Sequence, residues 1–113
     1  MTDANKMVLR TVYVDPDVDD QLRTDAAGQG LSKAELFRRY LTAGMKVART
    51  RPDLFEATQP EAGPPLVLRT VYMNPKLDDK LRVEAFDSRT SKNDLMRRYV
   101  RLGMGGVARS GVR

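Results

Sequence analysis

The side chains best suited to chemistry in this sequence are hydroxyls and cations, and they occur twice at one spacing. The motif Arg-Thr-Val-Tyr stands at 10–13 and again at 69–72. A tyrosine beside arginines can attack a phosphodiester, but that reaction needs a positioned base or metal ligands. The chain has no His, no Cys and no dense acidic pocket. We therefore expect no enzyme, no metal and no cofactor, and we expect these groups to act by hydrogen bonding and charge.

The composition favours a small basic protein with a polyanionic partner. The 113 residues carry a net charge of +5, and the pI is near 9.8. There is no apolar run of about 18 residues to span a membrane, and no secretory leader. We expect a cytoplasmic protein without a membrane partner.

An internal duplication organises the chain. Residues 8–45 align without a gap with residues 67–104, and 20 of the 38 aligned positions are identical. Matched positions are therefore 59 residues apart, and the two segments are called here the first and second copy. Between them, Pro52, Pro60 and a Pro64–Pro65 pair predict a semi-rigid linker rather than a helix or strand. The predicted organisation is a flexible N-terminus (1–7), a first unit (8–49), a Pro-rich linker (50–66), a second unit (67–109) and a tail (110–113).

Each copy predicts a strand followed by two helices. The alternating, β-branched runs at 8–14 and 67–73 are typical of strands. Asp15-Pro16 and Asn74-Pro75 then place a capping side chain before a proline at the first helical position. Gly28-Gln29-Gly30 ends the first helix. The second copy has Asp87-Ser88-Arg89 there, and a left-handed turn costs more at a residue with a Cβ.

The second helix of each copy begins with a serine cap and carries an apolar face. Ser32 to Glu35 predicts a capping box, and Ser91 to Asp94 a weaker one. The apolar stripes of both helices predict core, and we interpret the arginine pairs at 38–39 and 97–98 as a solvated or ion-paired face. The glycines at 103–106 are expected to fray the last helix into a flexible tail. The apolar positions assigned to the core are Val18, Leu22, Ala26, Leu36, Phe37, Tyr40 and Leu41, with Leu77, Leu81, Ala85, Leu95, Met96, Tyr99 and Val100 in the second copy.

A lone strand needs a partner for its backbone donors and acceptors, and the second copy supplies one. We expect strand 8–14 to pair antiparallel with strand 67–73, and the four helices to pack beneath. One face of the ribbon is then covered and the other is exposed. A two-stranded ribbon fits the major groove of DNA.

The motif Thr-Val-Tyr-Val-Asp-Pro, followed by Leu22-Arg23, Ala26 and Gly30-Leu31-Ser32-Lys33, resembles the ribbon-helix-helix superfamily of Arc, methionine and CopG-type repressors. The resemblance covers both copies, and the fused pair resembles TraY-type conjugation proteins. It implies a mainly α fold with a two-stranded antiparallel β-ribbon. The full expectation is a tandem ribbon-helix-helix (β-α-α-linker-β-α-α) that forms an intramolecular pseudo-dimer.

The resemblance also assigns the two faces of the ribbon, which the period-two pattern leaves open. It places Val12, Val14, Val71 and Met73 inward. The base-reading positions are then Leu9, Thr11, Tyr13, Leu68, Thr70 and Tyr72. Family members commonly have Arg, Lys, Asn or Gln at these positions, so sharp base discrimination here would require Arg10 and Arg69 to curl out from the ribbon ends. The phosphate-binding positions are Ser32, Lys33, Ser91 and Lys92 at the helix N-termini, with Arg10, Arg69 and Arg89.

These assignments imply a sequence-preferring double-stranded DNA-binding protein, associated with the nucleoid and acting as a transcriptional repressor. Its partner is DNA with two similar inverted half-sites, with possible further self-association on tandem sites. One alternative is a relaxosome accessory protein that binds an origin of transfer beside a relaxase. Another is an antitoxin-like module that binds a toxin, for which Leu54-Phe55 in the linker offers a small docking point. The second unit, with a net charge of +5 against +1 for the first, should bind the DNA backbone harder.

Overall fold

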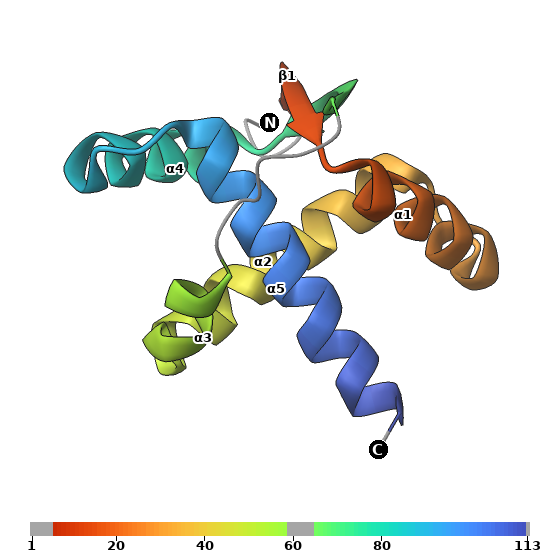
Figure 1. Cartoon of the computed structure of the whole chain (residues 1–113). Coiled ribbons are helices and arrows are strands. Elements are labelled where there is room, and N and C mark those ends of the chain that lie inside the picture. The colour runs from red at the N-terminus through yellow and green to blue at the C-terminus, as the bar shows by residue number, and fades with distance from the viewer. Residues whose placement is uncertain (1–5, 59–64, 113) are drawn as a thin grey trace.

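The computed structural model describes residues 6–58 and 65–112, with side chains described as far as residue 105. The predicted flexible N-terminus falls mostly on residues 1–5, outside the described residues. The described part is mainly helical, with one two-stranded antiparallel sheet (Figure 1). The elements are β1 (Val8–Val14), α1 (Pro16–Gln29), α2 (Lys33–Thr50), α3 (Pro52–Ala57), β2 (Val67–Met73), α4 (Pro75–Ser88) and α5 (Lys92–Val112).

The sheet is a ribbon of β1 and β2, which confirms the predicted pairing. The strands run antiparallel with Thr11 opposite Thr70 at the centre of the register. Because successive side chains in a strand point to opposite faces, every second residue turns inward. Val12, Val14, Val71 and Met73 are all buried, as expected from the resemblance.

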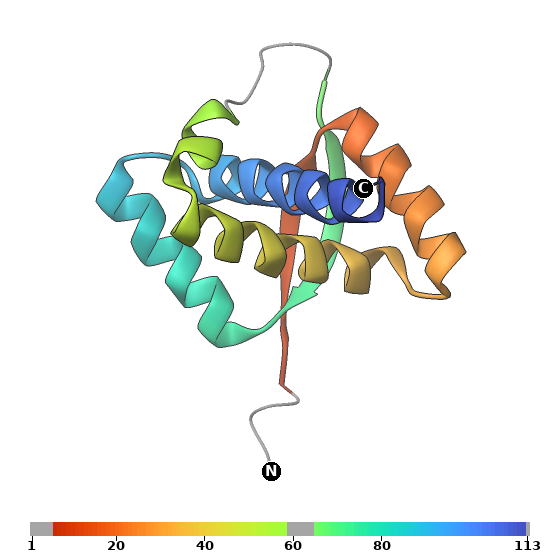
Figure 2. The ribbon, with the colours of Figure 1, turned by 90° about the horizontal axis from the view of Figure 1, so that it is seen from below.

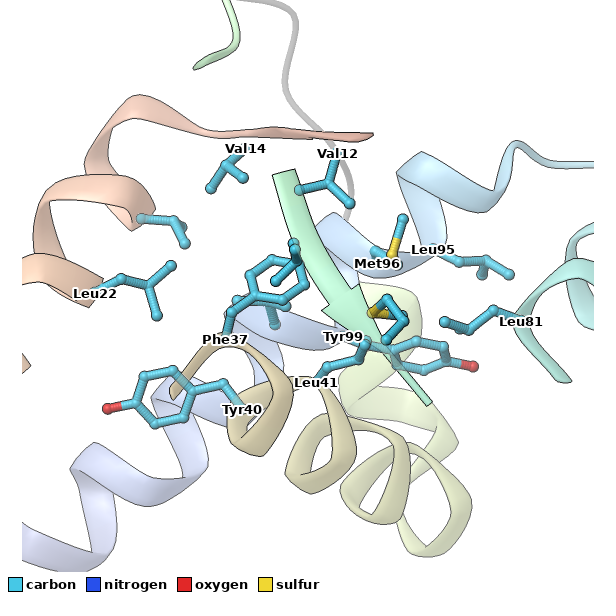
Figure 3. Close-up of a cluster of buried hydrophobic side chains, with 14 of the residues drawn as sticks. Val12, Val14, Leu22, Phe37, Tyr40, Leu41, Leu81, Leu95, Met96 and Tyr99 are labelled. Atoms are coloured by element: carbon cyan, nitrogen blue, oxygen red, sulfur yellow. The ribbon is translucent and has the colours of Figure 1, made fainter. Parts of the chain in front are cut away.

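The helices form a layer beneath the ribbon. In Figure 2, α2 and α5 lie side by side across the middle, and α1 and α4 lie on opposite flanks. The apolar cluster between the ribbon and the helices contains every predicted core residue except Leu77, which is only partly buried. Figure 3 shows Leu22 of α1 and Leu81 of α4 entering this cluster from opposite sides.

A tyrosine of each central helix donates a hydrogen bond to the flanking helix of its own copy. Tyr40 of α2 donates a hydrogen bond to Asp25 of α1 at 2.7 Å. Burial and the carboxylate of Asp25 raise the pKa of Tyr40 to about 12, so the hydroxyl stays a donor at neutral pH. At the matched position, Tyr99 of α5 donates to Glu84 of α4.

Two matched glycines allow α2 and α5 to pack backbone against backbone. A Cβ on Gly44 would overlap the carbonyl oxygen of Tyr99, and a Cβ on Gly103 would overlap that of Tyr40. The prediction that glycines 103–106 fray the last helix is wrong. Helix α5 continues through these glycines to Val112, and Gly103 lies within the helix at its contact with Tyr40.

The helix ends follow the predicted turn chemistry in all but one place. Asn74 accepts hydrogen bonds from the amides of Lys76 and Leu77, as expected of a cap. Asp15 stands at the matched position but makes no capping bond, because its carboxylate is bound instead by arginines of α5. Arg89 ends α4 with φ at 58°, in the left-handed region that its glycine counterpart Gly30 adopts at less cost.

Helix α3 corrects the prediction that residues 50–66 contain no helix. Pro52 occupies its first turn, where a missing amide hydrogen costs nothing because that group has no intrahelical partner. The proline therefore starts a helix instead of preventing one. Phe55 of α3 packs against the core, so Leu54-Phe55 is not the free docking point that the antitoxin-like interpretation required.

Candidate nucleic-acid interface

The outward face of the ribbon carries all six predicted base-reading residues. They form three cross-strand pairs, namely Leu9 with Tyr72, Thr11 with Thr70, and Tyr13 with Leu68. The leucines and tyrosines are about half exposed, between 48% and 55%, and both threonines are exposed. Four large apolar or aromatic side chains on one open strand face are unusual for a surface that contacts only water.

Both outer edges of the ribbon are bound by the central helices. Asn93 at the start of α5 accepts from the amide of Tyr13 at 2.8 Å and donates to its carbonyl oxygen at 3.2 Å. Arg38 of α2 donates to the carbonyl oxygen of Tyr72. These contacts satisfy backbone groups that an edge strand would otherwise present to another chain. They also hold the ribbon in a fixed position over the helices.

A buried carboxylate lies near each end of the ribbon and binds a lysine of the same copy and an arginine of the opposite strand. Asp19 of α1 binds Lys33 at 2.9 Å and Arg69 at 2.9 Å, and Arg23 of the same helix lies farther away at 3.7 Å. Its side chain is only 4% exposed. The cluster of Asp19, Lys33 and Arg69 is called here the first carboxylate cluster, and Asp78 of α4 repeats the arrangement in the second copy.

The second carboxylate cluster consists of Asp78, Lys92 and Arg10. Lys92 lies 2.6 Å and Arg10 3.1 Å from the Asp78 carboxylate. Each cluster therefore joins the helices of one copy to the strand of the other, and each keeps one net positive charge. This geometry qualifies the phosphate assignment made from the sequence. The two arginines and two lysines do not project freely, and Arg10 and Arg69 do not curl out of the ribbon ends as base readers.

Sequence reasoning missed these clusters. One signal was available, because both aspartates and all four cations are identical between the copies. The amphipathic spacing of the helices could not reveal the clusters, because the arginine of each cluster comes from a strand 50 or 68 residues away in the sequence.

Burial opposes ionisation of Asp19, but hydrogen bonds from Arg69 and Lys33 outweigh it and lower the pKa of the carboxyl group. Burial opposes ionisation of Asp78 in the same way, but hydrogen bonds from Lys92 and Arg10 outweigh it and lower the pKa of its carboxyl group. Carboxylates whose pKa is lower in the folded than in the unfolded chain stabilise the fold above their ordinary value, near 3.8. This stabilisation is lost as the pH falls below 3.8 and through the lower pKa values that the two carboxyl groups have in the folded chain.

We therefore expect the free energy of unfolding to decline steeply below about pH 4, and the decline to be shallower in an Asp19→Asn, Asp78→Asn variant. At pH 7 this variant should be less stable by about 1–3 kcal/mol for each site, because amide oxygens replace charge-assisted acceptors. Urea denaturation followed by circular dichroism across the pH range measures both effects. Asp20→Asn is the matched control, since Asp20 is exposed and its carboxylate pairs with the exposed Arg23 one turn away. An equally steep decline in the double variant would mean that other carboxylates control acid unfolding.

The remaining predicted phosphate positions lie at the helix N-termini beside the ribbon. Ser32 accepts from the amide of Glu35, and Ser91 accepts from the amide of Asp94, so both serines are exposed caps as predicted. The side chains that would complete a capping box bind arginines instead, Glu35 to Arg39 and Asp94 to Arg97. Arg89 is exposed, two residues before Ser91.

The arginine pairs of the central helices are mainly ion-paired or bound to backbone, as interpreted from the sequence. Arg97, whose side chain is 11% exposed, binds Asp15 and Asp94. Arg98 donates to the carbonyl oxygens of Phe55 and Thr58 at the end of α3.

A scan against protein-family models, a search of curated proteins and a search of solved structures each found no match to this chain. Among the helices of the described residues, none combines the length and apolar character needed to cross a membrane. Within the same residues, no three acidic side chains come together in a way that would hold a metal ion.

Proposed function

We propose that this chain is a sequence-preferring double-stranded DNA-binding protein that inserts its ribbon into the major groove and acts as a transcriptional repressor. In this proposal the two copies form an intramolecular ribbon-helix-helix pseudo-dimer. The observation that carries it is the outward face of the ribbon, where six exposed side chains on three cross-strand pairs lie outside the buried core. A two-stranded ribbon has the width to enter the major groove.

The register of the ribbon supports recognition of an inverted repeat. Thr11 faces Thr70, and the pairs on either side of them exchange the same two residue types, leucine and tyrosine. The two halves of the ribbon therefore present the same side chains in opposite directions. Threonine hydroxyls can donate or accept at base edges, and leucine or threonine methyl groups can contact thymine methyls.

Phosphate contacts would come from the groups that flank the ribbon. The N-termini of α2 and α5 lie beside it, because Lys33 and Lys92 reach the carboxylate clusters and Asn93 binds Tyr13. Helix N-termini attract anions, and each carboxylate cluster adds one net positive charge nearby. Such contacts position a protein on DNA, while the ribbon selects the sequence.

The test is selection of binding sites from a pool of random duplex DNA by the purified protein at two salt concentrations. We expect enrichment of one short inverted repeat at both concentrations. Retention without enrichment, lost steeply as salt rises, would reduce the protein to a backbone binder. No retention at low salt would contradict DNA binding altogether. The genomic position of the enriched site would then separate a repressor, at a promoter, from a relaxosome accessory protein, at an origin of transfer.

A further inference from the structure

Helix α3 shows how this protein holds an aromatic side chain on its central helices. The guanidinium of Arg98 lies 3.8 Å from the centre of the Phe55 ring, and the centre of the Tyr99 ring lies 4.9 Å from the same point. Arg98 also donates to the carbonyl oxygens of Phe55 and Thr58. One arginine thus binds both the ring and the backbone of a short helix.

The matched surface of α2 is open. Arg39 is the counterpart of Arg98, and its side chain is 60% exposed with a single ion pair to Glu35 on the same helix. It lines a shallow groove of about 560 Å³, which is called here the α2 groove. The residues that line it are Glu35, Arg38, Arg39, Thr42, Ala43 and Lys46. Its cations outnumber its single acidic group, and the Lys46 side chain has no partner among the described residues.

Helix α4 carries an apolar patch that the first copy lacks. Phe86 is 83% exposed and Val83 is 56% exposed, one turn apart on the same face. The matched residues of α1 are Ala27 and Thr24, so this patch is specific to the second copy. Asp87 follows Phe86 directly and has no side-chain partner within the described residues. The patch of Val83, Phe86 and Asp87 is called here the α4 patch.

We propose that this protein associates with further copies of itself, the α4 patch of one molecule entering the α2 groove of the next. Phe86 would stack on Arg39 as Phe55 stacks on Arg98, and Asp87 would lie against the cations of the groove. The pairing is complementary in charge, and the intramolecular contact of α3 supplies its template. An aromatic ring under a guanidinium is favourable at a surface, and more so once water is excluded.

Within one molecule the α4 patch does not occupy the α2 groove. Phe86 is 83% exposed and the Arg39 side chain is 60% exposed, so neither side chain is covered by the other. A contact between two different surfaces leaves one groove and one patch free on a pair that shares a single contact, so it extends into rows of molecules or closes into a ring. It uses none of the six side chains on the outward face of the ribbon.

Sedimentation of the full chain without DNA, over a range of concentrations at low salt, tests the proposal. We expect the mean mass to increase with concentration for the unmodified protein. Phe86→Ala and Arg39→Ala should each weaken the association by about 30-fold or more, the effect typical of a central anchor in an interface. Both side chains are largely exposed, so neither variant should lose its fold. Arg49→Ala, an exposed arginine of α2 outside the groove, and Thr24→Ala are matched controls that should associate normally.

Mixing the two defective variants distinguishes this contact from any symmetric one. The Phe86→Ala protein keeps an intact groove and the Arg39→Ala protein keeps an intact patch, so an equimolar mixture should form dimers and stop there. A mixture that stays monomeric would overturn the head-to-tail contact. Association that neither variant weakens would overturn the assigned surfaces. An unmodified protein that remains monomeric at every concentration would overturn self-association and leave the groove to a different occupant.

Discussion

Replacing Gly44 with alanine is expected to cost this protein a large part of its stability. The new Cβ would overlap the carbonyl oxygen of Tyr99, and the obstacle is backbone, which cannot rotate away as a side chain would. Helices α2 and α5 would have to separate, and the core beneath the ribbon would open with them. Overpacking of this kind costs about 1–3 kcal/mol or more, a large part of the roughly 5–15 kcal/mol that is typical of a small domain.

Gly103→Ala should have a similar effect, because its Cβ would overlap the carbonyl oxygen of Tyr40 across the same helix pair. The double variant is expected to be unfolded at room temperature. Thermal and urea denaturation followed by circular dichroism measure these losses. Gly105→Ala is the matched control on the same helix, where a Cβ would meet nothing within 4 Å, and it should be neutral or slightly stabilising. An unchanged unfolding midpoint for Gly44→Ala would contradict the close approach of the two helices.

The second large effect is expected from the centre of the ribbon, if the proposed function is correct. Thr11→Ala combined with Thr70→Ala removes both hydroxyls of the central cross-strand pair. Because both side chains are exposed, the fold should be nearly unaffected. Affinity for the selected inverted repeat should fall by about 1–3 kcal/mol for each base-reading hydroxyl that is removed, which is about 30-fold or more overall.

The test compares the affinity for the selected DNA site with the affinity for unrelated duplex DNA. The double threonine variant should lose affinity for the selected site and keep its affinity for unrelated duplex, with an unchanged salt dependence. Thr24→Ala on α1 is the control for a threonine away from the ribbon. Lys33→Ala with Lys92→Ala should weaken both kinds of binding alike, but it also leaves Asp19 and Asp78 with one cation fewer, so its stability must be measured alongside. Equal losses on both DNAs from the threonine variant would mean that the opposite face, or another element, reads the sequence.

Much of the local structure was predictable because it depends on residues close together in the sequence. The alternating runs in β1 and β2, the proline that begins each first helix and the serine that caps each second helix all rely on contacts within a few residues. The repeat then implied a partner for each strand, and the observed register agrees with it. Helix α3 was missed because Pro52 was interpreted as a break, although a proline is compatible with the first turn of a helix.

The sequence by itself determined the duplication, the strands, most helix boundaries and nearly all of the core, since periodicity and caps report on neighbouring residues. Only the tertiary structure decided which residues meet across the two copies. It placed Arg10 and Arg69 on the carboxylates of Asp78 and Asp19, and it brought Gly44 and Gly103 into backbone contact between α2 and α5. It also left Arg39 open where its counterpart Arg98 is covered by α3. These features join residues that lie far apart in the chain, so no local pattern specifies them and only the packing of the ribbon on the helices brings them together.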